Sequence, residues 1–210
     1  MSDPLHEGEA TRRRTGQRSQ SDALPPVYEY YASFSPPKFV LQATERLLIA
    51  VPPEYLAGIG AVVLRDAESL SGRDRRRKTG GRGRRFRLRD SLGVYHRERR
   101  GHAASIELFV DNILRATPRW ALATPGLRDV ALGETLYHEI GHHIHASFAP
   151  EYRDPEQVAE QWRRRLTPRY FRSNYRYLLP FAYALRAVLS VVRGATLRLS
   201  HTRSTSTDQR

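Results

Sequence analysis

The stretch His138-Glu139-Ile140-Gly141-His142 decides most of what can be inferred about this chain of 210 residues. Residues four apart lie on one face of a helix, one turn above each other, so the two histidines can reach the same point. Two imidazoles on one helical face can hold a zinc ion, and Glu139 then lies beside the open position of the metal, where it can accept a proton from water. The stretch therefore predicts a helix that carries a metal site.

A regular apolar pattern surrounds this stretch and predicts a long amphipathic helix. Asp129 is of a residue type that caps helices at the N-terminus, and the helix is expected to end before Pro150. Between these limits apolar residues recur every four positions, which predicts a stripe that faces the core. His138 and His142 lie beside this stripe, where a cleft can meet the core. The stripe consists of Leu132, Leu136, Ile140, Ile144 and Phe148.

Composition restricts the kind of metal site and widens the choice of partner. The chain has no cysteine, so disulfides, thiolate ligands and a cysteine nucleophile are excluded, and a transition-metal site must consist of histidine and carboxylate groups. The net charge is +13, and almost all of the positive charge comes from arginine. A strongly basic chain is a candidate for binding nucleic acid or an acidic surface, although arginine-rich surfaces and tails can also be merely solvated.

The order of polar and apolar segments predicts one folded domain between two tails. Residues 1–26 are polar, without periodicity, and are expected to be disordered, and residues 196–210 are expected to form a polar tail. The domain is expected to span residues 27–195. Within it, residues 72–85 belong to a Gly- and Arg-rich run, which predicts a flexible loop or an extended basic arm.

One long apolar segment, at residues 178–192, predicts a C-terminal helix. Pro180 and Arg186 interrupt it, and it is shorter than the roughly 20 residues that span a bilayer. Because residues 1–26 also lack the apolar stretch of a signal peptide, a cytoplasmic protein is expected. A weaker hypothesis places this helix and the arginines around it on an anionic membrane surface.

Shorter patterns predict the remaining elements of the domain. Pro36-Pro37 can open a helix that ends at Pro52-Pro53. Ile59–Arg65 is apolar and rich in β-branched residues, as in a buried strand. Two more strands are expected, at residues 85–89 or 93–97 and at Ala104–Asp111.

A catalytic zinc site usually takes three protein ligands, so a third must come from another element. The metzincin pattern would require glycine at 145 and histidine at 148, and this chain has His145 and Phe148 there. Asp154-Pro155 predicts the start of a helix that carries Glu156, the preferred ligand, and Glu160, the alternative. One carboxylate can bind the metal while the other accepts the free ring N–H of a ligand histidine. The other candidates are His143 and His145, which are expected to be solvated or to contact a ligand, and Glu151 and Asp154.

The two motifs together, HEIGH at 138–142 and ExxAExW at 156–162, resemble those of the gluzincin branch of the zincin metallopeptidases. The resemblance covers roughly residues 59–166, and it is to the minimal, single-domain members and the related ImmA/IrrE-like domains. It implies an α+β fold in which a small twisted β-sheet is followed by the HExxH active-site helix and then by the glutamate helix.

The resemblance also implies roles for individual residues. His138, His142 and Glu156 would bind one zinc ion per chain. Glu139 would be the general base of the reaction, and Glu160 would orient a ligand histidine.

In this family an edge strand of the sheet lies along the cleft and pairs with an extended substrate. The strand at Ala104–Asp111 precedes the motif helix and is expected to take this place. Its candidate substrate-strand residues are Ile106, Leu108 and Val110. A tyrosine or histidine often stabilises the tetrahedral intermediate, and the candidates for this role are Tyr170, Tyr175 and Tyr177.

Two functions follow from these observations as expectations. The first is a zinc-dependent metallopeptidase that hydrolyses peptide bonds in a peptide or protein substrate. The alternative is a non-catalytic or regulatory zincin-like module that binds nucleic acid or an acidic partner through its arginine-rich surface. Arg75–Arg89 would provide that surface, and Phe86 is the only aromatic residue in it, so specific base stacking is not expected.

Overall fold

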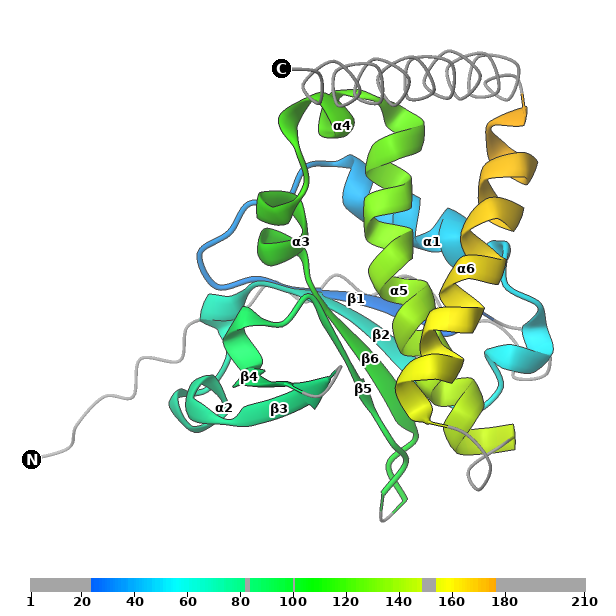
Figure 1. Ribbon diagram of the computed structural model, residues 1–210. Helices are drawn as coiled ribbons and strands as arrows, with labels where there is room; N and C mark the ends of the chain where they lie inside the picture. The colour runs from blue at the N-terminus through cyan, green and yellow to red at the C-terminus, as the bar shows by residue number, and fades with distance from the viewer. Residues whose placement is uncertain (1–23, 82–83, 100, 149–153, 177–210) are drawn as a thin grey trace, which may run out of the picture. The chain divides into compact units, whose positions relative to one another are not determined.

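The structure is a computed structural model that describes residues 24–81, 84–99, 101–148 and 154–176 (Figure 1). Residues 1–170 form one compact unit, and residues 171–210 form a second, which is described only up to Arg176. Most of the predicted N-terminal tail, the whole C-terminal tail and the predicted helix at 178–192 lie outside the described residues. Among the described residues, no helix combines the length and the hydropathy that a membrane crossing needs.

The sheet that supports the site has four strands, in the order β1 (Val27–Tyr30), β2 (Ile59–Arg65), β6 (Ala104–Phe109) and β5 (Gly93–His96). β1, β2 and β6 are parallel to one another, and β5 is antiparallel to β6. The side chains on one face of β2 and β6 are buried, so this face lies on the core. The fold is therefore α+β, as the sequence predicts, with a small mixed sheet. The fully buried residues of the two strands include Val62, Leu64, Ile106 and Leu108.

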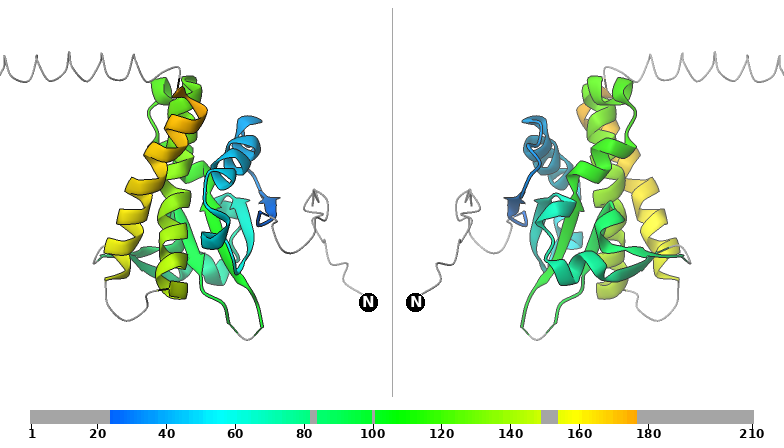
Figure 2. Two further views of the ribbon diagram at one scale, coloured as in Figure 1. Left: turned by 90° about the vertical axis from the view of Figure 1, so that its right-hand side faces the viewer. Right: turned by 90° about the vertical axis from the view of Figure 1, so that its left-hand side faces the viewer.

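Helices α1 (Phe39–Ile49) and α5 (Pro125–Phe148) pack against the sheet, and α5 lies between it and the part of α6 (Pro155–Asn174) that belongs to the first unit (Figures 1 and 2). The helix predicted after Pro36-Pro37 and the strand predicted at Ile59–Arg65 are confirmed. The shorter helices are α2 (Gly72–Arg76), α3 (Val110–Ala116) and α4 (Arg119–Ala123), with 3-10 turns η1 (Pro53–Tyr55), η2 (Ala67–Ser69) and η3 (Leu88–Asp90).

The predicted core stripe of α5 is confirmed except at its end. Leu132, Leu136, Ile140 and Ile144 are buried, whereas Phe148 is 59% exposed. The stripe ends before Phe148 because this residue is the last of the helix and extends beyond the core.

The start of α5 differs from the prediction. The helix begins at Pro125, and Asp129 is a fully buried residue of its second turn and not its N-terminal cap. The Tyr170 hydroxyl and the Arg46 guanidinium donate hydrogen bonds to Oδ2 of Asp129, at 2.6 and 2.8 Å. A buried carboxylate needs such partners, and a sequence pattern does not reveal them. Asp129 therefore joins α1 and α6 to α5.

The Gly- and Arg-rich run, predicted as a flexible loop at residues 72–85, contains regular structure instead. α2 begins after Ser71, whose hydroxyl accepts a hydrogen bond from the backbone of the helix. β3 (Lys78–Gly81) and β4 (Arg84–Arg87) then pair as an antiparallel hairpin. The prediction was wrong because a Gly-rich run is compatible with a hairpin as well as with a loop.

Candidate metal centre

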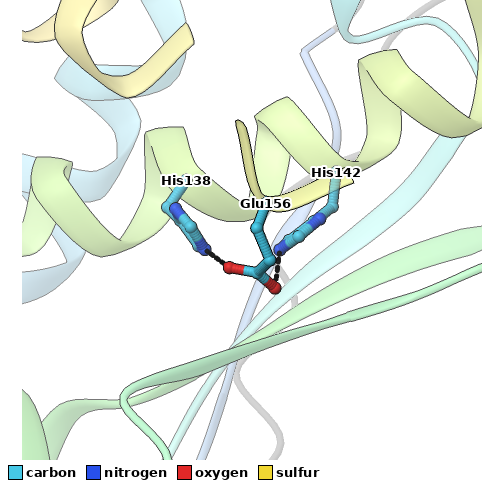
Figure 3. Close-up of side chains that lie close together, drawn as sticks. All are labelled: His138, His142 and Glu156. Atoms are coloured by element: carbon cyan, nitrogen blue, oxygen red, sulfur yellow. Dashed lines mark ion pairs between the residues drawn. The ribbon is translucent and has the colours of Figure 1, made fainter. Parts of the chain in front are cut away.

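His138 and His142 lie on one face of α5, one turn apart, as their spacing predicts (Figure 3). Their ring centroids are 4.8 Å apart, and the ring planes are almost perpendicular, at 87°. Burial, followed by the charges that His138 and His145 would carry, lowers the pKa of His142 to about 4. His142 is therefore neutral at pH 7, and the neutral imidazole is the form that binds a metal ion.

Glu156 brings a carboxylate from the first turn of α6 to the two imidazoles (Figure 3). Its Oε2 lies 3.6 Å from Nε2 of His138, and its Oε1 lies 3.6 Å from Nε2 of His142. The side chain of Asp154 accepts a hydrogen bond from the backbone N–H of Glu156, at 3.0 Å, and so fixes the start of α6. The structure thus brings together the three residues that the sequence selected.

The three side chains fit a metal ion of the size of zinc. One ligand atom from each lies within 4.8 Å of the other two. Atoms that bind zinc tetrahedrally at about 2.0–2.1 Å are about 3.4 Å apart, close to the 3.6 Å between each imidazole and the carboxylate. His138, His142 and Glu156 could therefore hold a metal ion, and they are the only such group of three in the described part of the chain.

The helix crossing that places Glu156 depends on Gly141, inside the motif. α5 and α6 approach so closely that a Cβ on Gly141 would lie 2.5 Å from Cα of Ala159 and 2.9 Å from its carbonyl oxygen. A larger residue at 141 would therefore push the two helices apart. Because Ala159 follows Glu156 by three residues, the same crossing sets the distance between the carboxylate and the histidines.

Glu160, one turn after Glu156, is not part of this ligand group. Its carboxylate accepts hydrogen bonds from Arg163, at 2.6 and 2.8 Å, and from Arg164, at 2.7 Å. Arg163 also forms an ion pair with Glu134 of α5. Geometry therefore favours Glu156 over Glu160 as the third ligand, and the role of Glu160 in orienting a histidine stays a prediction.

Glu139 is buried between α5 and β5. A Cβ on Gly93 would lie 3.0 Å from Cγ and 3.1 Å from Oε1 of Glu139, so the strand can approach only because residue 93 is glycine. Burial raises the pKa of Glu139 to about 8. A hydrogen bond from the backbone N–H of Tyr95 opposes this rise, and the negative charge of Glu156 adds to it. A carboxyl group with a pKa near neutrality can both accept and donate a proton.

The strand beside Glu139 is β5, the edge strand, and not β6. β6 has β2 on one side and β5 on the other, so no edge of it is open to a substrate. The prediction of Ile106, Leu108 and Val110 as substrate-strand residues is therefore wrong, and Val110 already belongs to α3. Alternation of polar and apolar residues reports that one face is buried, and it does not report the position of a strand within the sheet.

The hydrogen-bond pattern shows which backbone groups of β5 face its free edge. The carbonyl oxygen of Leu92 accepts a hydrogen bond from the N–H of Phe109, at 2.9 Å, and such pairs alternate along an antiparallel ladder. Val94 therefore pairs with β6, whereas the N–H and C=O groups of Gly93 and Tyr95 point away from the sheet. The hydrogen bond from Tyr95 to the buried carboxylate agrees with this pattern.

Tyr95 also holds β5 against α5 through its side chain. Its hydroxyl lies 3.1 Å from Nδ1 of His143, whose Nε2 lies 2.8 Å from the carbonyl oxygen of Ala57. Since a carbonyl can only accept, Nε2 carries the proton; burial lowers the pKa of His143, so Nδ1 accepts from the tyrosine. Sequence reasoning missed Tyr95, and the one available signal was its place two residues after Gly93 in a short strand.

Of the tyrosines predicted to assist a reaction, only Tyr170 lies in the same unit as the histidines. Tyr170 is fully buried and donates to Asp129, nine residues before His138 and therefore about 13 Å away along the helix. Tyr175 belongs to the second unit, and Tyr177 lies outside the described residues.

The chemistry of this site has to be inferred from the residues of this chain alone. No protein-family model, no curated protein and no solved structure matches the chain. The resemblance to zincin metallopeptidases therefore remains an expectation, and the chemistry of the site follows from its own residues.

Proposed function

We propose that this chain is a zinc-dependent metallopeptidase, in which His138, His142 and Glu156 bind the metal and Glu139 is the general base. The observation that carries the proposal is the convergence of three ligand atoms within 4.8 Å of one another. A buried carboxylate and the free edge of a sheet lie next to this group. A metal site, a general base and a strand edge that can pair with an extended chain are the parts that peptide hydrolysis needs.

The roles of the residues follow from their positions. A bound zinc ion supplies a Lewis acid that polarises a carbonyl group and lowers the pKa of water to about 7. Glu139 accepts a proton from the attacking water and delivers it to the leaving amine. The N–H of Tyr95 orients the Glu139 carboxylate, and His143 in turn holds Tyr95 in place.

β5 provides the backbone groups that would position an extended peptide. The hydroxyl of Ser91 donates a hydrogen bond to the carbonyl oxygen of Gly93, at 2.6 Å. The N–H of Gly93 and the C=O of Tyr95 point to the same free edge and can pair with a peptide backbone. Such pairing places the scissile bond beside Glu139 without requiring a particular side chain.

The experiment that tests this proposal is cleavage of a library of proteome-derived peptides, with the products identified by mass spectrometry. The zinc-loaded wild-type protein is expected to cleave peptides, and Glu139→Gln is expected to keep the metal and lose at least about 100-fold in rate, the scale of general-base catalysis. His102→Ala, an exposed histidine outside the ligand group, is the control and should retain both. Equal cleavage by Glu139→Gln and the wild type would exclude Glu139 as the general base. Zinc binding without cleavage would favour a binding module.

A further inference from the structure

The segment Arg73–Arg89 has no part in the proposed reaction. Ten of its 17 residues are Lys or Arg, and one is Asp. Six of its described basic residues have exposed side chains, and five of these six form no ion pair with a residue that the structure describes. We call these five the basic shoulder: Arg73, Arg76, Arg77, Lys78 and Arg87.

Two residues of the basic shoulder are arranged at a cost to stability. Lys78 and Arg87 are directly opposite each other in the β3–β4 hairpin. Like charges in directly opposed positions destabilise a strand pair, and a lysine–glutamate pair would stabilise it. The arrangement is therefore better explained by a negatively charged ligand than by the stability of the hairpin.

The basic shoulder is fixed relative to β5. The backbone N–H of Leu88 donates a hydrogen bond to the carbonyl oxygen of Arg77, at 2.8 Å, and closes the base of the hairpin. The Leu88 side chain is buried in a cluster with Leu70 and Phe109, and Val94 of β5 packs against this cluster. The base of the hairpin thus belongs to the same hydrophobic core as the edge strand β5.

The chain between the hairpin and β5 is also held in place. The side-chain amide of Asn112 donates hydrogen bonds to the carbonyl oxygens of Arg89 and Ser91, at 2.7 and 2.8 Å. From this base the hairpin extends toward the first turns of α6, which carry Glu156 (Figures 1 and 2). An extended peptide that pairs with β5 and continues past Gly93 therefore runs next to the basic shoulder.

A nucleic acid also carries negative charge, but two observations favour a polypeptide. Phe86 is the only aromatic residue in Arg73–Arg89, so the segment lacks the stacked aromatic side chains that bind single strands. The neighbouring edge of β5 offers N–H and C=O groups at the spacing of a peptide backbone and not at that of a sugar-phosphate chain.

We infer that the basic shoulder selects acidic polypeptides as substrates, by binding the Asp and Glu side chains of an extended segment that pairs with β5. This inference rests on the proposed function, because it names the substrate class of the same site. A single exposed ion pair contributes little, so selection depends on several contacts together and weakens as salt is raised.

The test is fluorescence anisotropy of two labelled peptides of equal length, one with several glutamates and one with glutamines in their place, added to the zinc-loaded Glu139→Gln protein. The glutamate peptide is expected to bind about tenfold more tightly, which a few exposed ion pairs can provide. The double variant Arg73→Glu/Lys78→Glu should bring this ratio close to unity. The control Lys38→Glu/Arg119→Glu, which changes the net charge equally at exposed positions elsewhere, should leave the ratio unchanged.

Equal ratios in the shoulder variant and in the control variant would overturn the inference. So would tighter, shoulder-dependent binding of a single-stranded oligonucleotide of equal charge. Lys78→Glu alone guards against a folding artefact, because a glutamate opposite Arg87 stabilises the hairpin; this variant should lower the ratio without lowering the free energy of unfolding.

The proposed function is tested separately, by cleavage of the peptide library. Shoulder-dependent binding without any cleavage by the wild-type protein would contradict the inference as stated, because the acidic peptide would then be a ligand and not a substrate. Cleavage without any preference for acidic peptides would leave the proposed function intact and would remove the inference alone.

Discussion

The candidate metal centre and the basic shoulder are built in opposite ways, although both depend on β5. In the candidate metal centre, Glu139 is buried, and Gly141 lies against the backbone of Ala159, so packing fixes this carboxylate and the helix crossing that brings Glu156 to the histidines. In the basic shoulder, the five side chains are exposed and act through their summed charge. A displacement of one ligand atom is therefore expected to abolish metal binding. The affinity of the basic shoulder for an acidic ligand is instead expected to depend on the number of its charges. Substitutions in the two regions are therefore expected to have different effects.

The largest effect is expected from Glu139→Gln in the metal-free protein. The folded protein raises the pKa of Glu139 from 4.5 to about 8, so the protonated form stabilises the fold. This stability is fully present below pH 4.5, and it is lost as the pH rises through 8. Glutamine does not ionise, so at pH 9 the variant should be more stable than the wild type by on the order of 4 kcal/mol.

Urea unfolding in the presence of a chelator, at pH 5 and at pH 9, measures this difference. Glu54→Gln, which changes an exposed carboxylate, is the matched control and should follow the wild type. If the wild type and Glu139→Gln show the same dependence on pH, the carboxylate is not buried as described.

The second effect is expected from Gly141→Ala. The added methyl group meets the backbone of Ala159, which cannot move without α6, so we expect a loss of about 3 kcal/mol in stability and at least tenfold in zinc affinity. Gly133→Ala on the same helix is the control, because its methyl group meets side chains and no backbone: the end of Leu47, at 2.8 Å, and the ring of Tyr137, at 3.5 Å. Isothermal titration with zinc distinguishes the two. Unchanged affinity in Gly141→Ala would show that the helix crossing does not set the site.

A smaller effect is expected from Tyr170→Phe. It removes the hydroxyl that donates to the buried Asp129, so the free energy of unfolding should fall by about 1–2 kcal/mol. Zinc content and cleavage rate should stay the same, because Tyr170 contacts Asp129, which lies nine residues before His138 on α5. A loss of cleavage at full zinc content would instead return Tyr170 to the list of residues that assist the reaction.

The smallest effect on stability is expected from Lys78→Glu. It replaces a like-charge pair opposite Arg87 by an ion pair, so β3–β4 should gain about 0.2–1 kcal/mol. Amide hydrogen exchange in the hairpin should slow, while the metal centre is unaffected. Faster exchange in the hairpin would contradict the described register.

Much of the metal centre follows from the sequence because local periodicity determines it. Four-residue spacing places His138 and His142 on one face, and a capped helix start predicted the helix that brings Glu156 to within 3.6 Å of both. The core stripe of α5 follows from the same periodicity.

What the sequence did not predict depends on contacts between distant segments. The order of strands in the sheet made β5 the edge and not the strand at Ala104–Asp111. Burial of Asp129 depends on Tyr170 and Arg46, which lie 41 and 83 residues away in sequence. Tyr95 lies beside Glu139 because β5 pairs with β6, whose position in the sequence gives no sign of this contact. None of these contacts produces a repeating pattern of polar and apolar residues, so no sequence pattern could predict them.

Metal binding by His138, His142 and Glu156 is tested by the zinc content of the dialysed protein, measured by elemental mass spectrometry in the wild type, Glu156→Gln and Glu160→Gln. The structure predicts about one zinc ion per chain in the wild type and in Glu160→Gln, and a large loss in Glu156→Gln. No stoichiometric zinc in the wild type, or zinc retained by Glu156→Gln and lost by Glu160→Gln, would contradict the account.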